Sequence, residues 1–227
     1  MPEDLRKSVA ELVGTFALVF VGAGSIIANE FSGGQVGLLG IALAHGLVLA
    51  IAISATGHIS GGHINPVVTI CFLITRRLGV TTAIYYVVAQ FVGAVLAALL
   101  LRVIFPESAW AAESVKLGTP LVASEISFAT AVLVELVLTF FLVFAIFGTA
   151  GDPQGPKGIA GFGIGLVLVF DILVGGPLTG AAMNPARTFG PALAGVYWDD
   201  HLVYWIGPLI GGLAAAVLYR YVLQRER

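Results

Sequence analysis

The chain has 227 residues, of which 58% are hydrophobic and only 11% are charged, and its formal net charge is −2. A mean hydropathy of +0.99 excludes a soluble globular domain of this size, because too little polar surface remains to keep the chain dispersed. The composition therefore predicts an integral membrane protein.

Six apolar stretches are long enough to cross a bilayer, whose hydrocarbon of roughly 30 Å takes about 20 helical residues. They cover residues 8–29, 36–56, 78–101, 126–149, 158–175 and 202–219. The first stretch lacks the order of a cleaved signal peptide, so we expect it to stay in the chain. Six spans place both termini on the same side of the membrane.

Two shorter apolar stretches, 66–75 and 185–194, follow the second and the fifth span. Each would form a helix about 15 Å long, which is half a bilayer. Each begins with Asn-Pro, a strong helix start, because the Asn side chain caps the first turn and Pro has no N–H to lose. The loops before them, 57–64 and 175–183, are Gly-rich and expected to be non-helical, which lipid allows only where the backbone lines a wet cavity. We therefore predict two re-entrant half-helices beside an aqueous path.

The two halves of the chain are near copies. Residues 58–69 align with 177–188 at an offset of 119 residues, and Glu11-Leu-Val-Gly-Thr-Phe resembles Glu135-Leu-Val-Leu-Thr-Phe. We predict one channel domain over 1–227, with repeats at about 1–105 and 125–227 and a linker at 106–124. Three spans in each repeat invert the second repeat relative to the first. The expected fold is an all-α membrane protein of six transmembrane helices and two re-entrant half-helices in an inverted 3+3 repeat.

Basic residues sort by side of the membrane, and this sorting sets orientation. The side with both termini carries eight, the opposite side two: Arg6, Lys7, Arg76, Arg77, Lys157, Arg220, Arg225 and Arg227 against Arg102 and Lys116. The sequence therefore predicts cytoplasmic termini.

Asn65 and Asn184 would face each other across the pore if the half-helices meet, with their amide N–H groups as donors to water. Each half-helix also aims a dipole end equivalent to about +0.5 charge at this point. A hydrated cation or a hopping proton meets a barrier there, whereas a neutral molecule does not. The alternative is that Asn-Pro merely starts two ordinary short helices.

The two Asn-Pro boxes, with Arg187 after the second, resemble the aquaporin (major intrinsic protein) family over nearly the whole chain. The resemblance implies a pore in each protomer, a homotetramer, and an outer selectivity filter of His45, Ile172, Ala181 and Arg187. The strict water-only pattern has Phe first and His second, and the present combination is instead similar to the filter of plant vacuolar-membrane aquaporins. That similarity suggests a wider pore. Arg187 places a charge inside the membrane, and such a charge is functional by default. His45, in contrast, could also be an interior histidine with satisfied hydrogen bonds.

Buried carboxylates need partners, and Glu11 and Glu135 occupy equivalent points of the first and fourth spans. Each could accept hydrogen bonds from the non-helical loops, with His63 as a partner for Glu11, and the resemblance implies that they brace these loops. A proton relay is the alternative and would suit a coupled transporter. Asp171 is expected near the outer end of the fifth span, where it either tunes the charge of the mouth or is a solvated interfacial carboxylate.

A passive channel for water, with some permeability to other small neutral solutes and none to protons or ions, is the function that these features favour. A broader facilitator of glycerol, urea, ammonia or hydrogen peroxide is the alternative, and a coupled transporter or a structural membrane protein fits less well. No spacing suggests an enzyme, a cofactor, a metal site or nucleic-acid binding, and the single Cys71 excludes an intramolecular disulfide. The expected partners are water, small neutral solutes and the lipid bilayer. We expect a multi-pass protein of the cell (plasma) membrane.

Overall fold

The computed structural model describes residues 1–224, and every regular element in this range is helical. The six apolar helices long enough to cross a membrane confirm the predicted spans. Their bounds are α1 Glu3–Phe31, α2 Gly37–Ser60, α4 Val80–Ile104, α6 Phe128–Ile146, α7 Ala160–Thr179 and α9 Val203–Leu218, and α6 and α9 continue into the π-helical turns Phe147–Gly151 and Tyr219–Leu223. Two of the basic residues used to predict orientation, Arg225 and Arg227, lie outside the described residues.

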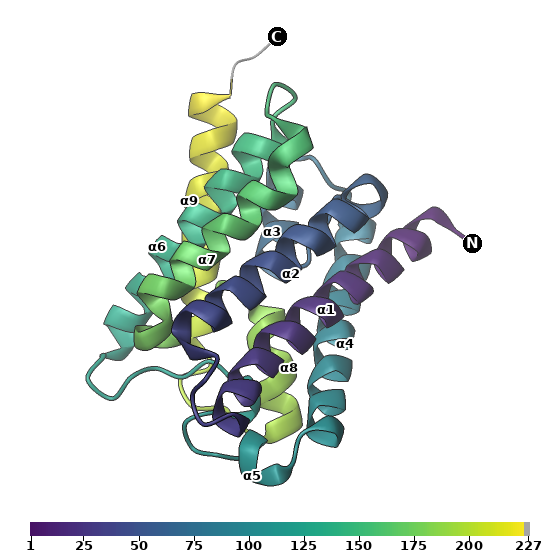
Figure 1. Ribbon diagram of the computed structural model, residues 1–227. Coiled ribbons are helices and arrows are strands. Elements are labelled where there is room, and N and C mark those ends of the chain that lie inside the picture. The colour runs from purple at the N-terminus through teal and green to yellow at the C-terminus, as the bar shows by residue number, and fades with distance from the viewer. Residues whose placement is uncertain (225–227) are drawn as a thin grey trace.

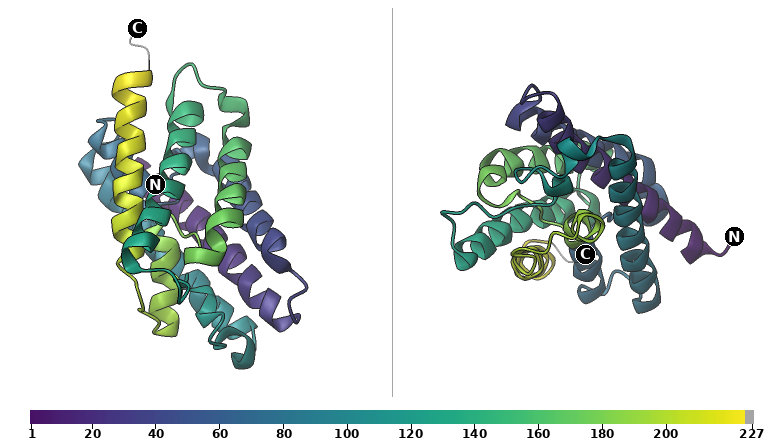
Figure 2. Two further views of the ribbon diagram at one scale, coloured as in Figure 1. Left: turned by 90° about the vertical axis from the view of Figure 1, so that its left-hand side faces the viewer. Right: turned by 90° about the horizontal axis from the view of Figure 1, so that it is seen from below.

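The long helices pack in pairs that match between the two halves of the chain. Helix α1 packs along α4, α6 packs along α9, and α2 and α7 cross each other in the middle (Figure 1). Figure 2 shows α6, α7 and α9 side by side in its left view. At the α2–α7 crossing, a Cβ on Gly46 would lie 2.5 Å from the carbonyl oxygen of Gly165, so only glycines allow this approach.

Two short helices, α3 (Pro66–Ile74) and α8 (Pro185–Gly195), lie inside the bundle, one above the other in Figure 1. The view from below shows α8 end-on among the longer helices (Figure 2, right). Their bounds agree with the predicted half-helices to within one residue. The predicted all-α fold with six membrane helices and two re-entrant half-helices is therefore confirmed.

The prediction that 57–64 and 175–183 are wholly non-helical is wrong at their first residues. Helix α2 continues to Ser60 and α7 to Thr179, and each ends where a glycine adopts a left-handed conformation: Gly61 has φ 92° and Gly180 has φ 79°. Glycine has no Cβ to clash in this region and commonly ends helices. Gly57 and Gly175 are instead accommodated within the helices, and the true loops are only the residues before each Asn.

The linker between the repeats is more ordered than a simple connection. It contains the short helix α5 (Glu107–Trp110) and the 3-10 turn η1 (Lys116–Gly118), with Leu117 fully buried. Gly118 has φ 72°, and a Cβ there would lie 2.6 Å from the Cβ of Ala23 on α1. The linker thus folds closely against the end of α1, opposite the side that holds the termini.

Candidate functional site: a pore between two half-helices

Glu11 binds the loop before Asn65, here called the first box loop, with both of its carboxylate oxygens. The side chain is fully buried, and Oε1 accepts hydrogen bonds from the Ser60 hydroxyl at 2.6 Å and from the His63 backbone N–H at 2.9 Å. Oε2 accepts from the Ile64 N–H at 2.6 Å and from Gln90 Nε2 at 2.8 Å. His63 therefore reaches Glu11 through its backbone.

The His63 imidazole has a different partner from the one considered in the sequence, because its Nδ1 lies 3.1 Å from the hydroxyl of Thr69.

Glu135 binds the loop before Asn184, here called the second box loop, in the same way. It is also fully buried, and Oε1 accepts from the Thr179 hydroxyl at 2.7 Å and the Ala182 N–H at 2.9 Å. Oε2 accepts from the Met183 N–H at 2.8 Å. A carboxylate has no donor of its own when ionised, so a loop of converging N–H groups suits it.

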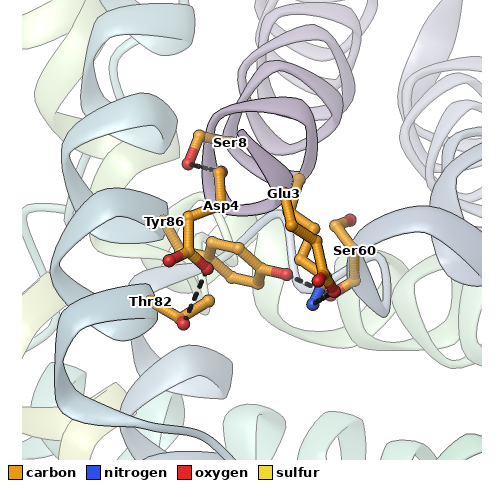
Figure 3. A network of polar contacts seen from close by, with 7 residues as sticks. Glu3, Asp4, Ser8, Ser60, Thr82 and Tyr86 are labelled. Carbon is orange, nitrogen blue, oxygen red and sulfur yellow. Dashed lines mark hydrogen bonds and ion pairs between the residues drawn. The ribbon is translucent and has the colours of Figure 1, made fainter. Parts of the chain in front are cut away.

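Two tyrosines hold the ends of α2 and α7 in the same symmetric way. The hydroxyl of Tyr86 donates to the Ser60 carbonyl at 2.7 Å, as Figure 3 shows, and that of Tyr204 donates to the Thr179 carbonyl at 2.8 Å. In the same view Thr82 of α4 donates to a carboxylate oxygen of Asp4 on α1. The two tyrosine contacts tie the ends of α2 and α7 to α4 and α9, so the loops begin at fixed points.

The residue before each Asn is held in a strained conformation. Ile64 has φ 55° and Met183 has φ 52°, a region that is unfavourable for side chains with a Cβ and worst for a β-branched one. Each N–H is held by a glutamate, and each carbonyl accepts from the Asn of the opposite loop: Asn65 Nδ2 to Met183 at 2.8 Å and Asn184 Nδ2 to Ile64 at 2.9 Å. The two loops thus fix each other's carbonyls.

Both Asn side chains also cap their own half-helices. Asn65 Oδ1 accepts from the Val67 N–H, and Asn184 Oδ1 accepts from the N–H groups of Ala186 and Arg187. The expectation of free amide donors needs a correction, because one of the two N–H bonds of each amide is used on the opposite loop. Among residues 1–224 the second N–H of each Asn has no partner, and the N-termini of α3 and α8 meet at this point.

A cavity runs past both Asn side chains. One part of its wall is polar, with His45, His63, Asn65, Asn184 and Arg187. The rest is mostly apolar: Leu18, Leu49, Ile53, Ile64, Val68, Leu142, Ile146, Ile164, Leu168, Ala181 and Ala182. Its volume is about 20 Å³, which holds about one or two water molecules. It shares lining residues with a cavity of about 520 Å³ by His58 and Lys157 and with one of about 180 Å³ by Ile172, so the smallest of the three volumes lies between the other two.

Arg187 is 2% exposed and held at the end of this cavity nearer to the linker. Nη1 donates to the Gly118 carbonyl at 2.7 Å, and Nη2 lies 3.3 Å from Nε2 of His45. His45 Nδ1 lies 2.9 Å from the Ile41 carbonyl, which can only accept, so Nδ1 carries the proton and Nε2 is free to accept from the guanidinium. The linker and α2 therefore fix the guanidinium from two sides.

The four expected filter residues fall on two adjoining cavities. His45, Ala181 and Arg187 line the cavity of about 20 Å³, here called the narrow cavity. Ile172 and His45 line the cavity of about 180 Å³, here called the outer cavity. The structure brings all four to the same end of the path. Gly118, which holds Arg187, was not singled out in the sequence, although a glycine two residues before Pro120 signals a turn.

The expectation that Asp171 is a solvated interfacial carboxylate is wrong, whereas the expectation that it tunes the charge of the mouth stays a prediction. The side chain is 1% exposed, so it is not a solvated interfacial carboxylate, and it lines neither cavity at the outer end of the path. Neither oxygen has a hydrogen-bond partner among residues 1–224. The neighbouring position, Ile172, faces the outer cavity, and the turn of the helix directs Asp171 into the protein behind it.

The family model for "Major intrinsic protein" matches residues 1–219. The chain is similar to "Probable aquaporin TIP3-2" of Arabidopsis thaliana, with 46% identity over 98% of this chain and 85% of the relative. It is also similar to "Aquaporin TIP4-4" of Zea mays, with 45% identity over 95% of this chain and 85% of the relative. The solved structure of the aquaglyceroporin from Plasmodium falciparum has the same fold, with a TM-score of 0.82, 22% identity and coverage of 97% of both chains.

Proposed function

The chain belongs to the major intrinsic protein family, and from this premise we propose that it conducts water passively along the path between α3 and α8. The observation that carries the proposal is the pair Asn65 and Asn184, each with one amide N–H left over beside a narrow, mostly apolar cavity. The chain is a multi-pass membrane channel rather than an enzyme.

Exclusion of protons and ions follows from the polarity of this point. A water molecule that accepts from both Asn side chains turns its own hydrogens away along the path, toward either end. Two helix N-termini meet there, each equivalent to about +0.5 charge, and Arg187 adds a full positive charge nearby. A neutral molecule passes without this electrostatic penalty.

We assign the filter role to His45, Ile172, Ala181 and Arg187, and the role of loop support to Glu11, His63 and Glu135. The supporting observations are the shared cavities of the first group and the convergent hydrogen bonds of the second. Ile172 and Ala181 bring little bulk and no side-chain hydrogen bond to the opening. We therefore expect some passage of small neutral solutes such as urea or glycerol.

We further propose that the two repeats form one channel domain, that it assembles as a homotetramer, and that both termini are cytoplasmic. Exposed apolar side chains on α2 and α7, such as Leu47, Ile51 and Phe162, offer a surface for either lipid or a second copy. The excess of Lys and Arg on the side of the termini supports the orientation. A cell-membrane location stays a prediction, to which the plant relatives lend no support.

Purified protein in liposomes tests the proposal. Under an impermeant osmotic gradient, vesicles with the protein should shrink much faster than empty vesicles, as followed by light scattering. Gradients of glycerol and urea then separate a water-selective pore, without rapid reswelling, from a broader facilitator. Shrinkage no faster than in empty vesicles would refute the proposed function.

A further inference from the structure

Gly22 of α1 lies directly against the imidazole of His45. Gly22 is buried, and a Cβ added there would lie 2.5 Å from Nε2 and 2.6 Å from Cδ2 of that ring. We propose that Gly22 is a specificity-determining positioning residue. Because glycine has no side chain, the imidazole of His45 can lie against α1, and this position determines the width of the filter. The inference rests on the proposed function and adds a residue outside the predicted filter to it.

His45 is held at both ring nitrogens, so it cannot yield to a larger neighbour without losing a contact. Nδ1 donates to the carbonyl of Ile41 at 2.9 Å, and Nε2 lies 3.3 Å from Nη2 of Arg187. The atom that a Cβ on Gly22 would meet most closely is this same Nε2. A methyl group at Gly22 and the contact with Arg187 therefore compete for the position of one atom.

The surroundings decide where the ring would move. The backbone of α1 closes one side, whereas His45 borders both the narrow cavity and the outer cavity. These two cavities offer open space beside the ring, so we expect a displaced imidazole to enter the path of the solute. Arg187 keeps its bond to the Gly118 carbonyl and stays at the filter, which leaves a narrower opening.

Gly24 provides a matched control on the same helix. It is also buried, but a Cβ there would meet only the Cδ2 of Leu101, at 3.1 Å, which is the end of a flexible side chain on α4. Gly24→Ala tests the general effect of alanine in this part of α1 without touching the filter.

The experiment compares the wild type with Gly22→Ala, Gly24→Ala, His45→Ala and the double variant Gly22→Ala/His45→Ala in liposomes. The readout is the ratio of urea permeability to water permeability, each measured in the same vesicles. We expect this ratio to fall at least about threefold in Gly22→Ala and to be unchanged in Gly24→Ala. In the His45→Ala background the added methyl has no ring to displace, so the double variant should match His45→Ala alone.

An unchanged ratio in Gly22→Ala would overturn the inference, and so would an equal fall with and without the imidazole. If Gly22→Ala fails to insert, a folded double variant supports the inference, because removing the ring relieves the clash. A double variant that also fails to fold would overturn it, since α1 would then need the glycine for its own packing. A wild type without water permeability would instead refute the proposed function.

Discussion

Replacing Glu135 with Gln is the sharpest test of how the second box loop is held. The amide keeps the shape of the carboxylate but exchanges one oxygen for an NH₂ group. If the NH₂ takes the place of Oε2 it faces the Met183 N–H, and if it takes the place of Oε1 it faces the Ala182 N–H. Either orientation leaves one buried backbone N–H opposite another donor.

The size of the effect follows from these contacts. A buried donor without a partner costs about 1–3 kcal/mol, and the bonds that remain lose the extra strength of a charged acceptor. We expect a loss of about 3 kcal/mol in the free energy of unfolding, which lowers the unfolding midpoint by roughly 6–12 °C for a chain of this size. In the orientation that places the NH₂ opposite Met183, this residue loses the contact that offsets its strained φ of 52°, and its carbonyl no longer stays aligned with Asn65.

The assay follows fluorescence of the three Trp residues during heating of the purified protein, together with water permeability in liposomes. Glu125→Gln is the matched control, because Glu125 is exposed and its carboxylate accepts from the hydroxyl of the adjacent Ser124 at the surface. Glu11→Gln should resemble Glu135→Gln, since each orientation again leaves a backbone N–H facing an NH₂. A Glu135→Gln protein with the midpoint and permeability of the control would show that the carboxylate does not hold the loop.

Three further predictions follow from the site. Arg187→Val should raise glycerol permeability at least about threefold while water still passes, because the largest polar group leaves the filter; unchanged glycerol reswelling in liposomes would contradict the assigned role. Asn184→Ala removes the cap of α8 and the donor to the Ile64 carbonyl. We therefore expect the free energy of unfolding to fall by about 2 kcal/mol and water permeability to decrease. Wild-type values for both quantities would count against this role of Asn184. Tyr204→Phe removes one hydrogen bond to the Thr179 carbonyl outside the pore, so stability should fall by about 1 kcal/mol with water permeability intact, and a blocked channel would show that Tyr204 does more than hold a helix end.

The membrane spans and the two half-helices could be predicted because their signals are local. Apolar length decides a span, and Asn-Pro marks the start of a helix wherever it falls. The ends of α2 and α7 could not be placed in the same way. Several glycines precede each box, and only the three-dimensional contacts select Gly61 and Gly180 as the residues at which α2 and α7 end.

The residues around the pore also divide into those with a signal in the sequence and those that depend on three-dimensional contacts. Glu11 and Glu135 were found through their matching positions in the two repeats, because a repeated buried carboxylate needs repeated partners. Gly118 and Gly22 had no such signal, since their importance depends on Arg187 and His45 lying against them across long stretches of chain. Asp171 was misplaced because the sequence does not show which way one position on an apolar helix points.

Separation of water from protons at the meeting point of α3 and α8 is the central property of the proposed channel. Proton flux under a pH gradient should therefore be measured in the same liposomes that show fast osmotic shrinkage, across a range of protein content. We expect water permeability to rise with protein content and proton flux to stay at the level of empty liposomes. Proton flux that rises in parallel with water permeability would contradict proton exclusion at the two half-helices.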